Sequence, residues 1–136
     1  MKNRKILGAA IAVIVLFFFT SCDKGIRGQY TGKWDFRVVH RSGPYDRSEY
    51  DTVYYLGKIT LGAAYNKLKI EYMENTKITL ELDEYGNLTK DFEDPHEFAF
   101  GEFEGGGKVQ IHLGWSALGG GNTYSIEGTK RERRGK

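Results

Sequence analysis

The sequence has almost no cysteine, little proline and no strong excess of charge of either sign. Its 136 residues include one cysteine, Cys22, and two prolines, and the formal net charge is +2. A single cysteine excludes an internal disulfide and a zinc site built on several thiolates. The near balance of charge excludes the strongly basic surface typical of nucleic-acid-binding proteins. Residues 23–136 also lack helical periodicity, which excludes a helix bundle.

A short, uninterrupted apolar run lies near the N-terminus. Residues 6–19 form it, Lys2, Arg4 and Lys5 precede it, and the small pair Thr20-Ser21 follows it. This layout is typical of a secretory signal peptide. At 1.5 Å per residue a helix over the run spans roughly 21 Å, whereas the hydrocarbon core of a bilayer is ~30 Å thick. The length therefore argues against a transmembrane helix.

The residues after the run, Phe19-Thr20-Ser21-Cys22, resemble the lipobox of bacterial lipoproteins in the loose form used by some Gram-negative lineages. The stricter form has Leu near the position of Phe19 and Gly or Ala in place of Ser21. The resemblance implies cleavage before Cys22, a diacylglycerol on its thiol and an acyl chain on the new amino group. Two or three such chains exceed what stable membrane anchoring needs. The alternative is an ordinary signal peptide with Cys22 as a spare thiol.

Loss of the signal peptide changes the charge of the chain. The signal peptide carries three of the 20 Lys and Arg residues, so residues 22–136 hold 17 against 18 Asp and Glu, a formal charge of −1. We expect residues 1–21 to be cleaved, 22–29 to form a lipidated N-terminus and short linker, and 30–131 to form one β domain. Residues 132–136 would be a basic C-terminal tail, which we interpret as a solvated segment rather than a lipid-binding one.

The domain is predicted to be all-β, because apolar and polar residues alternate in segment after segment. The expected strands cover residues 32–38, 52–59, 68–72, 78–82, 87–90, 98–100, 109–115 and 124–128, with turns at 83–87, 105–107 and 119–122. Short links favour antiparallel neighbours, and eight such strands close into an up-and-down barrel or split into a two-sheet β-sandwich. Glycines within or near the strands favour the barrel. These are Gly32, Gly57, Gly101, Gly114 and Gly128.

The first strand begins with Gly32-Lys33-Trp34, which resembles the G-x-W element of lipocalins and their small relatives. The second lipocalin element, T-D-Y, is not present as such. The resemblance implies a compact lipocalin-like barrel in which Trp34 plugs the closed end and a basic residue beyond the last strand packs across it. Arg131 is the candidate for that barrel-closing pair, and Arg133 is the second choice.

No catalytic residue, metal site or cofactor is predicted. His40, His96 and His112 do not form a metal-ligand pattern, and the acidic segment 91–97 lacks the spacing and central glycine of a calcium loop. The residues expected to line a ligand site are aromatic, and their place in the alternation predicts that they face the barrel interior. They are Trp34, Phe36, Tyr55, Tyr72, Phe100, Trp115 and Tyr124, with Phe98 also expected to point inward.

The sequence thus predicts a non-enzymatic lipoprotein of a Gram-negative cell envelope, held in the membrane through Cys22. The leading hypothesis is that the barrel mouth binds a small apolar ligand or an envelope partner. The alternative is a structural or interaction lipoprotein with a filled core, which docks another envelope protein through outer-surface residues such as Val39, Tyr54 and Leu56. An enzyme or enzyme inhibitor is the third hypothesis. The choice of membrane, its leaflet and the oligomeric state stay open.

Overall fold

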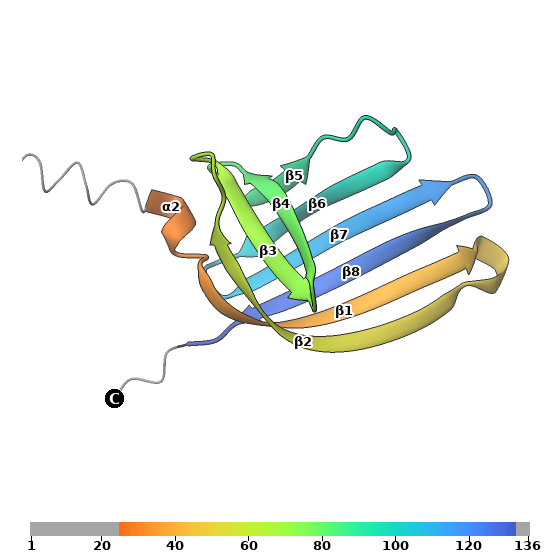
Figure 1. Cartoon of the computed structure of the whole chain (residues 1–136), viewed down its shortest axis with the longest axis horizontal. Helices are drawn as coiled ribbons and strands as arrows, with labels where there is room; N and C mark the ends of the chain where they lie inside the picture. Colours follow the sequence, from red (N-terminus) through yellow and green to blue (C-terminus); the bar gives the residue numbers. More distant parts are fainter. Residues whose placement is uncertain (1–24, 133–136) are drawn as a thin grey trace, which may run out of the picture.

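A computed structural model describes residues 25–132, which form eight antiparallel strands closed into a barrel (Figure 1). Each strand pairs with the next in the chain, and β8 pairs with β1. The predicted up-and-down barrel is therefore confirmed, and the alternative of two packed sheets is wrong. The strands are β1 (Gly32–Pro44), β2 (Glu49–Leu61), β3 (Lys67–Met73), β4 (Thr76–Leu82), β5 (Asn87–Lys90), β6 (Glu97–Glu104), β7 (Lys108–Ala117) and β8 (Gly120–Lys130).

Every predicted strand lies within one of these strands, but the structure differs from the prediction at three places. A short helix, α2 (Gly25–Gly28), and a 3-10 turn (Tyr45–Arg47) were not expected. The predicted turn at 119–122 is too long, because β8 already begins at Gly120. Gly121 is a strand residue that permits a close approach of two backbones: a Cβ there would lie 2.6 Å from the carbonyl oxygen of Trp115.

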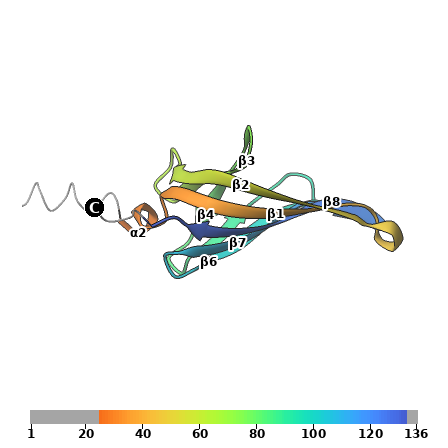
Figure 2. The same ribbon diagram turned by 90° about the horizontal axis from the view of Figure 1, so that it is seen from below.

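The strands differ in length, and this gives the barrel two unlike ends. β3, β4 and β5 are short, whereas β1, β2, β7 and β8 continue well beyond them as a curved sheet (Figures 1 and 2). We call residues 39–44, 49–56, 113–117 and 120–125 the extension. The closed end carries α2, and the connection between β1 and β2 lies at the far tip of the extension (Figure 1).

The barrel interior is filled by apolar side chains, and none of the described residues is a buried polar or charged one. Alternate residues of each strand point inward, so that Trp34, Phe36 and Val38 of β1 face Ile59, Ile111 and others across the interior. The buried core comprises Tyr30, Trp34, Phe36, Val38, Ile59, Leu68, Ile70, Tyr72, Leu80, Leu82, Leu88, Ala99, Phe103, Val109, Ile111, Leu113 and Ile126. Every core residue among the described residues lies between Tyr30 and Ile126, within residues 23–136.

In the part of the chain that the structure covers, no helix is both long enough and apolar enough to span a membrane. The predicted signal peptide and Cys22 lie outside the described residues.

Candidate functional site

A cleft of about 290 Å³ opens where the closed barrel meets the extension, and we call it the mouth cleft. Its walls come from four segments of the chain that the barrel brings together. Six residues give it an apolar surface, and the polar residues Glu97 and Asn122 also line it. The apolar residues are Ile78, Phe92, Phe98, Leu113, Trp115 and Tyr124. The strand pairing explains the placement of Leu113 and Tyr124, which lie opposite each other in the β7–β8 pair. They are two residues along their strands from the buried pair Ile111 and Ile126, so they lie on the same inner face of the sheet.

Trp115 is the most accessible aromatic ring of the mouth cleft. Its side chain is 43 % exposed, and it pairs across the strands with Asn122. The ring of His96 lies edge-on to it, with the ring centroids 6.0 Å apart. A large aromatic face held in place by neighbours but open on one side is suited to contact another flat, apolar group.

Polar groups are few and lie at the rim of the mouth cleft. The rings of His40 and Tyr124 stack with centroids 4.4 Å apart, and His40 Nε2 contacts Asn122 Oδ1. Burial raises the pKa of the Tyr72 phenol, and the nearby Tyr124 phenol raises it further. The Tyr72 hydroxyl therefore keeps its proton well above neutral pH. Apolar walls with a small number of polar groups are typical of small-molecule sites.

Of the predicted ligand-lining residues, the structure brings Trp115 and Tyr124 together in the mouth cleft and places Tyr72 in the adjacent core. Trp34 and Phe36 are fully buried deeper in the barrel, where they contact each other with ring centroids 6.4 Å apart. They therefore belong to the core and form no accessible surface.

The prediction that Phe100 points inward is wrong, whereas Phe98 is partly buried and lines the mouth cleft. Phe100 is about half exposed, and it lies opposite His112 on the outer face of β6 and β7. The inner positions of β6 are Ala99, Gly101 and Phe103 instead. A strand with apolar residues on both faces gives no signal for its phase, so the sequence supports either orientation.

Tyr55 occupies an intermediate position on β2. Its side chain is partly exposed, and its hydroxyl donates a 2.8 Å hydrogen bond to Glu71 Oε1 of β3. The Glu71 carboxylate raises the pKa of the Tyr55 phenol, because loss of the proton would place two negative charges side by side. Tyr55 thus links β2 to β3 where the two strands begin to diverge.

Trp34 lies at the closed end, as the G-x-W resemblance implied. Its indole Nε1 donates a 2.8 Å hydrogen bond to the carbonyl oxygen of Tyr30, and Phe103 lies 5.8 Å away between ring centroids. The rings of Tyr30 and Phe103 stack at 3.7 Å. These two aromatic residues cover the indole at this end of the barrel.

Arg131 makes its contact on the outer face. Its Nε donates a 2.8 Å hydrogen bond to Asp35 Oδ2, which lowers the pKa of that carboxyl and raises that of the guanidinium. The side chains of both residues are about half exposed, so the pair contributes little to stability. The contact found for Arg131 is thus with the strand residue after Trp34, and Arg133 lies outside the described residues.

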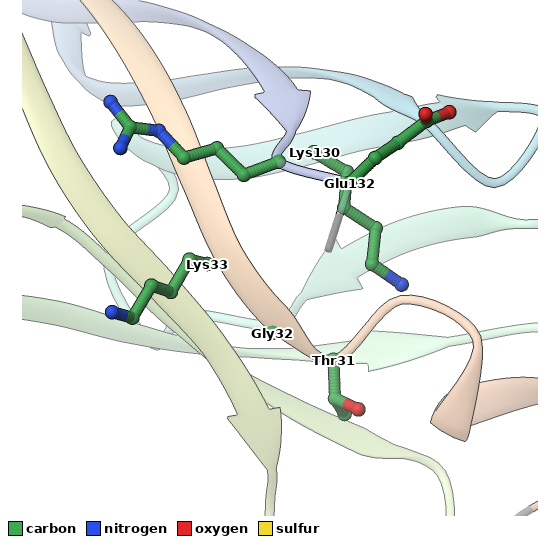
Figure 3. Close-up of a pocket in the computed structure, with 6 residues that line it drawn as sticks. Thr31, Gly32, Lys33, Lys130 and Glu132 are labelled. Atoms are coloured by element: carbon green, nitrogen blue, oxygen red, sulfur yellow. The ribbon is translucent and has the colours of Figure 1, made fainter. Parts of the chain in front are cut away.

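A second hollow, of about 920 Å³, lies at the closed end and is bounded by residues 31–33 and 130–132 (Figure 3). Its charged side chains do not converge on one point: Lys33, Lys130 and Glu132 extend in different directions (Figure 3). The Lys130 amine donates to the carbonyl oxygen of Gln29. Because these groups do not converge, the hollow gives no indication of which ligand it would bind. The mouth cleft is therefore the better candidate site.

Groups of three or more metal-ligating side chains do not occur among residues 25–132. In the acidic segment 91–97, Asp94 Oδ1 accepts a 2.8 Å hydrogen bond from the backbone N–H of His96. This is a turn within the loop itself, and it orients the carboxylate toward its own backbone.

Comparison with known proteins does not assign the chain to a family. No family model matches it, and no curated protein matches its sequence. Among solved structures, a protein described as Odorant Binding Protein OBP1 matches with a TM-score of 0.40 and 15% sequence identity, over 80% of this chain and 76% of that chain. A likeness at this level carries no argument about function, and the barrel assignment follows from the strand pairing itself.

Proposed function

We propose that the chain is a lipid-anchored, non-enzymatic protein of the cell envelope that binds a small apolar ligand at the mouth cleft. The observation that carries the proposal is the exposed aromatic surface of that cleft, with Trp115 and Tyr124 on adjacent strands. Its volume of about 290 Å³ is close to the lower limit of small-molecule pockets, roughly 300 Å³. The ligand is therefore small and flat.

The filled interior supports this size limit. Side chains such as Trp34, Ile59 and Leu80 are fully buried in the barrel interior, so a long acyl chain entering beneath the mouth cleft would have to displace core side chains. A ligand would lie across the mouth, with one face against Trp115 and its edge near the polar group of His40 and Asn122.

Lipidation of Cys22 would orient the barrel relative to the membrane. Cys22 directly precedes the segment that enters α2, and α2 lies at the closed end of the barrel (Figure 1). An acyl anchor at that end would leave the mouth cleft facing away from the membrane surface. The site would then be open to ligands in the aqueous compartment on that side of the membrane.

The ligand proposal predicts that the domain binds the apolar probe N-phenylnaphthylamine. Residues 23–136 are expected to enhance the probe's fluorescence saturably, and Trp115→Ala is expected to lower the affinity by about tenfold, since burying an aromatic face contributes roughly 1.5 kcal/mol. The measurement is a fluorescence titration at fixed probe concentration with increasing protein.

Tyr65→Ala is the control, because it removes an exposed aromatic ring from the connection between β2 and β3, at a position that does not line the mouth cleft. The titration curve of this variant should coincide with that of the unsubstituted domain. If both variants bind the probe as the unsubstituted domain does, or if none of the three binds it, the mouth cleft is not the ligand site.

The anchoring proposal predicts a modified N-terminal peptide. In the full chain expressed in a Gram-negative host, mass spectrometry of that peptide should show cleavage before Cys22 together with the mass of a diacylglycerol and an acyl chain. Cys22→Ser should abolish the acyl mass and leave the signal peptide attached, because the hydroxyl is a poorer nucleophile than the thiol. An unmodified Cys22, or cleavage at another residue, would contradict the proposal.

A further inference from the structure

β2 has one long free edge. On one side it pairs with β1 without interruption, from Glu49 opposite Ser42 to Ile59 opposite Gly32. On its other side it pairs with β3 only over Lys58–Leu61. Gly57 is buried against the carbonyl oxygen of Glu71 in β3, but residues 49–56 carry a row of accessible backbone N–H and C=O groups to which no strand within 25–132 is paired. We call residues 49–56 the free edge. They lie at the margin of the extension (Figure 1).

The free edge has few of the features by which edge strands are usually protected from pairing, since its charged residues are Glu49 and Asp51, at the end nearest the tip of the extension. It contains no proline, lysine or arginine, and its register with β1 shows no bulge. The opposite margin of the extension differs. There β6 pairs with β5 from Ala99 onward, and the preceding loop is acidic and contains Pro95.

The side chains of the free edge are unusually apolar for a solvent-exposed strand. Tyr54 is 76 % exposed and Val53 is 40 % exposed, and they lie on opposite faces of β2. Tyr50 and Leu56 are also exposed, on the same face as Tyr54. A regular, apolar edge with unpaired backbone groups is a template for the addition of another strand.

We propose that two copies of this chain join through their free edges, β2 against β2, about a two-fold axis that passes Val53. In an antiparallel pair, opposite residues lie on the same face. The register centred on Val53 places Val53 opposite its copy, Thr52 opposite Tyr54, and Tyr50 opposite Leu56. Apolar and aromatic side chains thus meet on both faces of the joined sheet.

Charge and length select this register. A register centred on Asp51 would put two aspartates opposite each other, and one centred on Tyr50 would put Glu49 opposite Asp51. Like charges directly opposite destabilise a strand pair. Centring on Val53 opposes no two carboxylates, pairs residues 50–56 of the two copies and leaves the charged Glu49 outside the paired segment.

The two-fold arrangement also ends the association at two copies. Each free edge is used by the other, and the remaining margin of the extension at β6 is short, so among residues 25–132 the extension offers no further edge as long as residues 49–56. One strand pair is a small interface, so we expect a weak, concentration-dependent dimer. Confinement to a membrane through Cys22 would raise the effective concentration of the two copies.

The test uses residues 23–136, which contain no native cysteine, and introduces a single cysteine in each variant. Val53→Cys places two thiols opposite each other at the axis, so mild oxidation should give a disulfide-linked dimer. Tyr50→Cys is the matched control on the same edge. In the proposed register its thiol lies six residues along the strand from its copy, about 20 Å away, and should not link.

Sedimentation velocity of the unsubstituted domain should show dimer that grows with concentration. Val53→Lys should show only monomer over the same range, because two ammonium groups would then face each other at the axis. Circular dichroism checks that both variants keep the β spectrum. The proposal is overturned if the Val53 and Tyr50 cysteines link equally, if neither links, or if the unsubstituted domain stays monomeric throughout. If the domain stays monomeric, the partner of the free edge would instead be an extended segment of a different protein.

Discussion

Replacement of Trp34 by alanine is expected to lower the free energy of unfolding by about 3–5 kcal/mol, the range found for large aromatic residues removed from a core. The indole is fully buried, and it contacts the rings of Phe36 and Phe103. The substitution leaves a cavity and also removes the hydrogen-bond donor of the Tyr30 carbonyl. Since a domain of this size has a total stability of about 5–15 kcal/mol, much of the margin would be lost. Urea unfolding followed by circular dichroism measures the effect.

Two matched variants separate the effect of the lost apolar volume from that of the lost hydrogen bond and from that of burial. Trp34→Phe keeps most of the apolar volume and loses the N–H donor, so it should lower the free energy of unfolding by only about 1–3 kcal/mol. Trp115→Ala makes the same chemical change at the partly exposed mouth and should lower it by about 1 kcal/mol or less. Equal losses for Trp34→Ala and Trp115→Ala would contradict the placement of Trp34 in the core.

Gly57→Ala is expected to be the second most damaging substitution, with a loss of about 3 kcal/mol of stability, at the upper end of the usual range for overpacking. A Cβ at this position would lie 1.9 Å from the backbone carbonyl oxygen of Glu71 and 2.8 Å from Cε2 of Phe36. The backbone of β3 and a buried ring would both have to move. The expected readout is a lower urea midpoint with an unchanged slope.

Gly106→Ala is the control for this prediction. It lies in the turn between β6 and β7, where a Cβ would meet no atom within 4 Å and no positive φ is required. Its free energy of unfolding should stay within about 0.5 kcal/mol of the unsubstituted domain, as for most surface substitutions. A mild effect of Gly57→Ala, similar to that of Gly106→Ala, would show that β2 and β3 do not approach each other as described.

The strand alternation was sufficient to predict an all-β domain of eight strands, because each strand contributes one buried face to a single core. Glycines favoured closure over a sandwich, and Gly57 shows the physical reason: it is where β3 approaches β2 and the ring of Phe36. The burial of Trp34 at the start of β1 was also predictable from its place in the G-x-W element.

The extension and the mouth cleft could not be predicted in the same way. Beyond Val38, β1 has no buried residue, and β2 has none before Gly57, so the alternation on which strand prediction depends is lost there. The mouth cleft combines residues far apart in the sequence, such as Ile78 and Trp115. Phe100 shows a third limit, since a strand with apolar residues on both faces fits either phase.

The most direct test of the mouth-site proposal is a proton–nitrogen correlation spectrum of residues 23–136 during titration with N-phenylnaphthylamine. The chain has two tryptophans, one in the core and one at the mouth, so two indole N–H signals report on the two places. We predict that the Trp115 signal shifts progressively with added probe while the Trp34 signal stays in place. A shift of Trp34 would mean that the barrel interior admits the ligand, and no shift of either signal would contradict binding at the mouth.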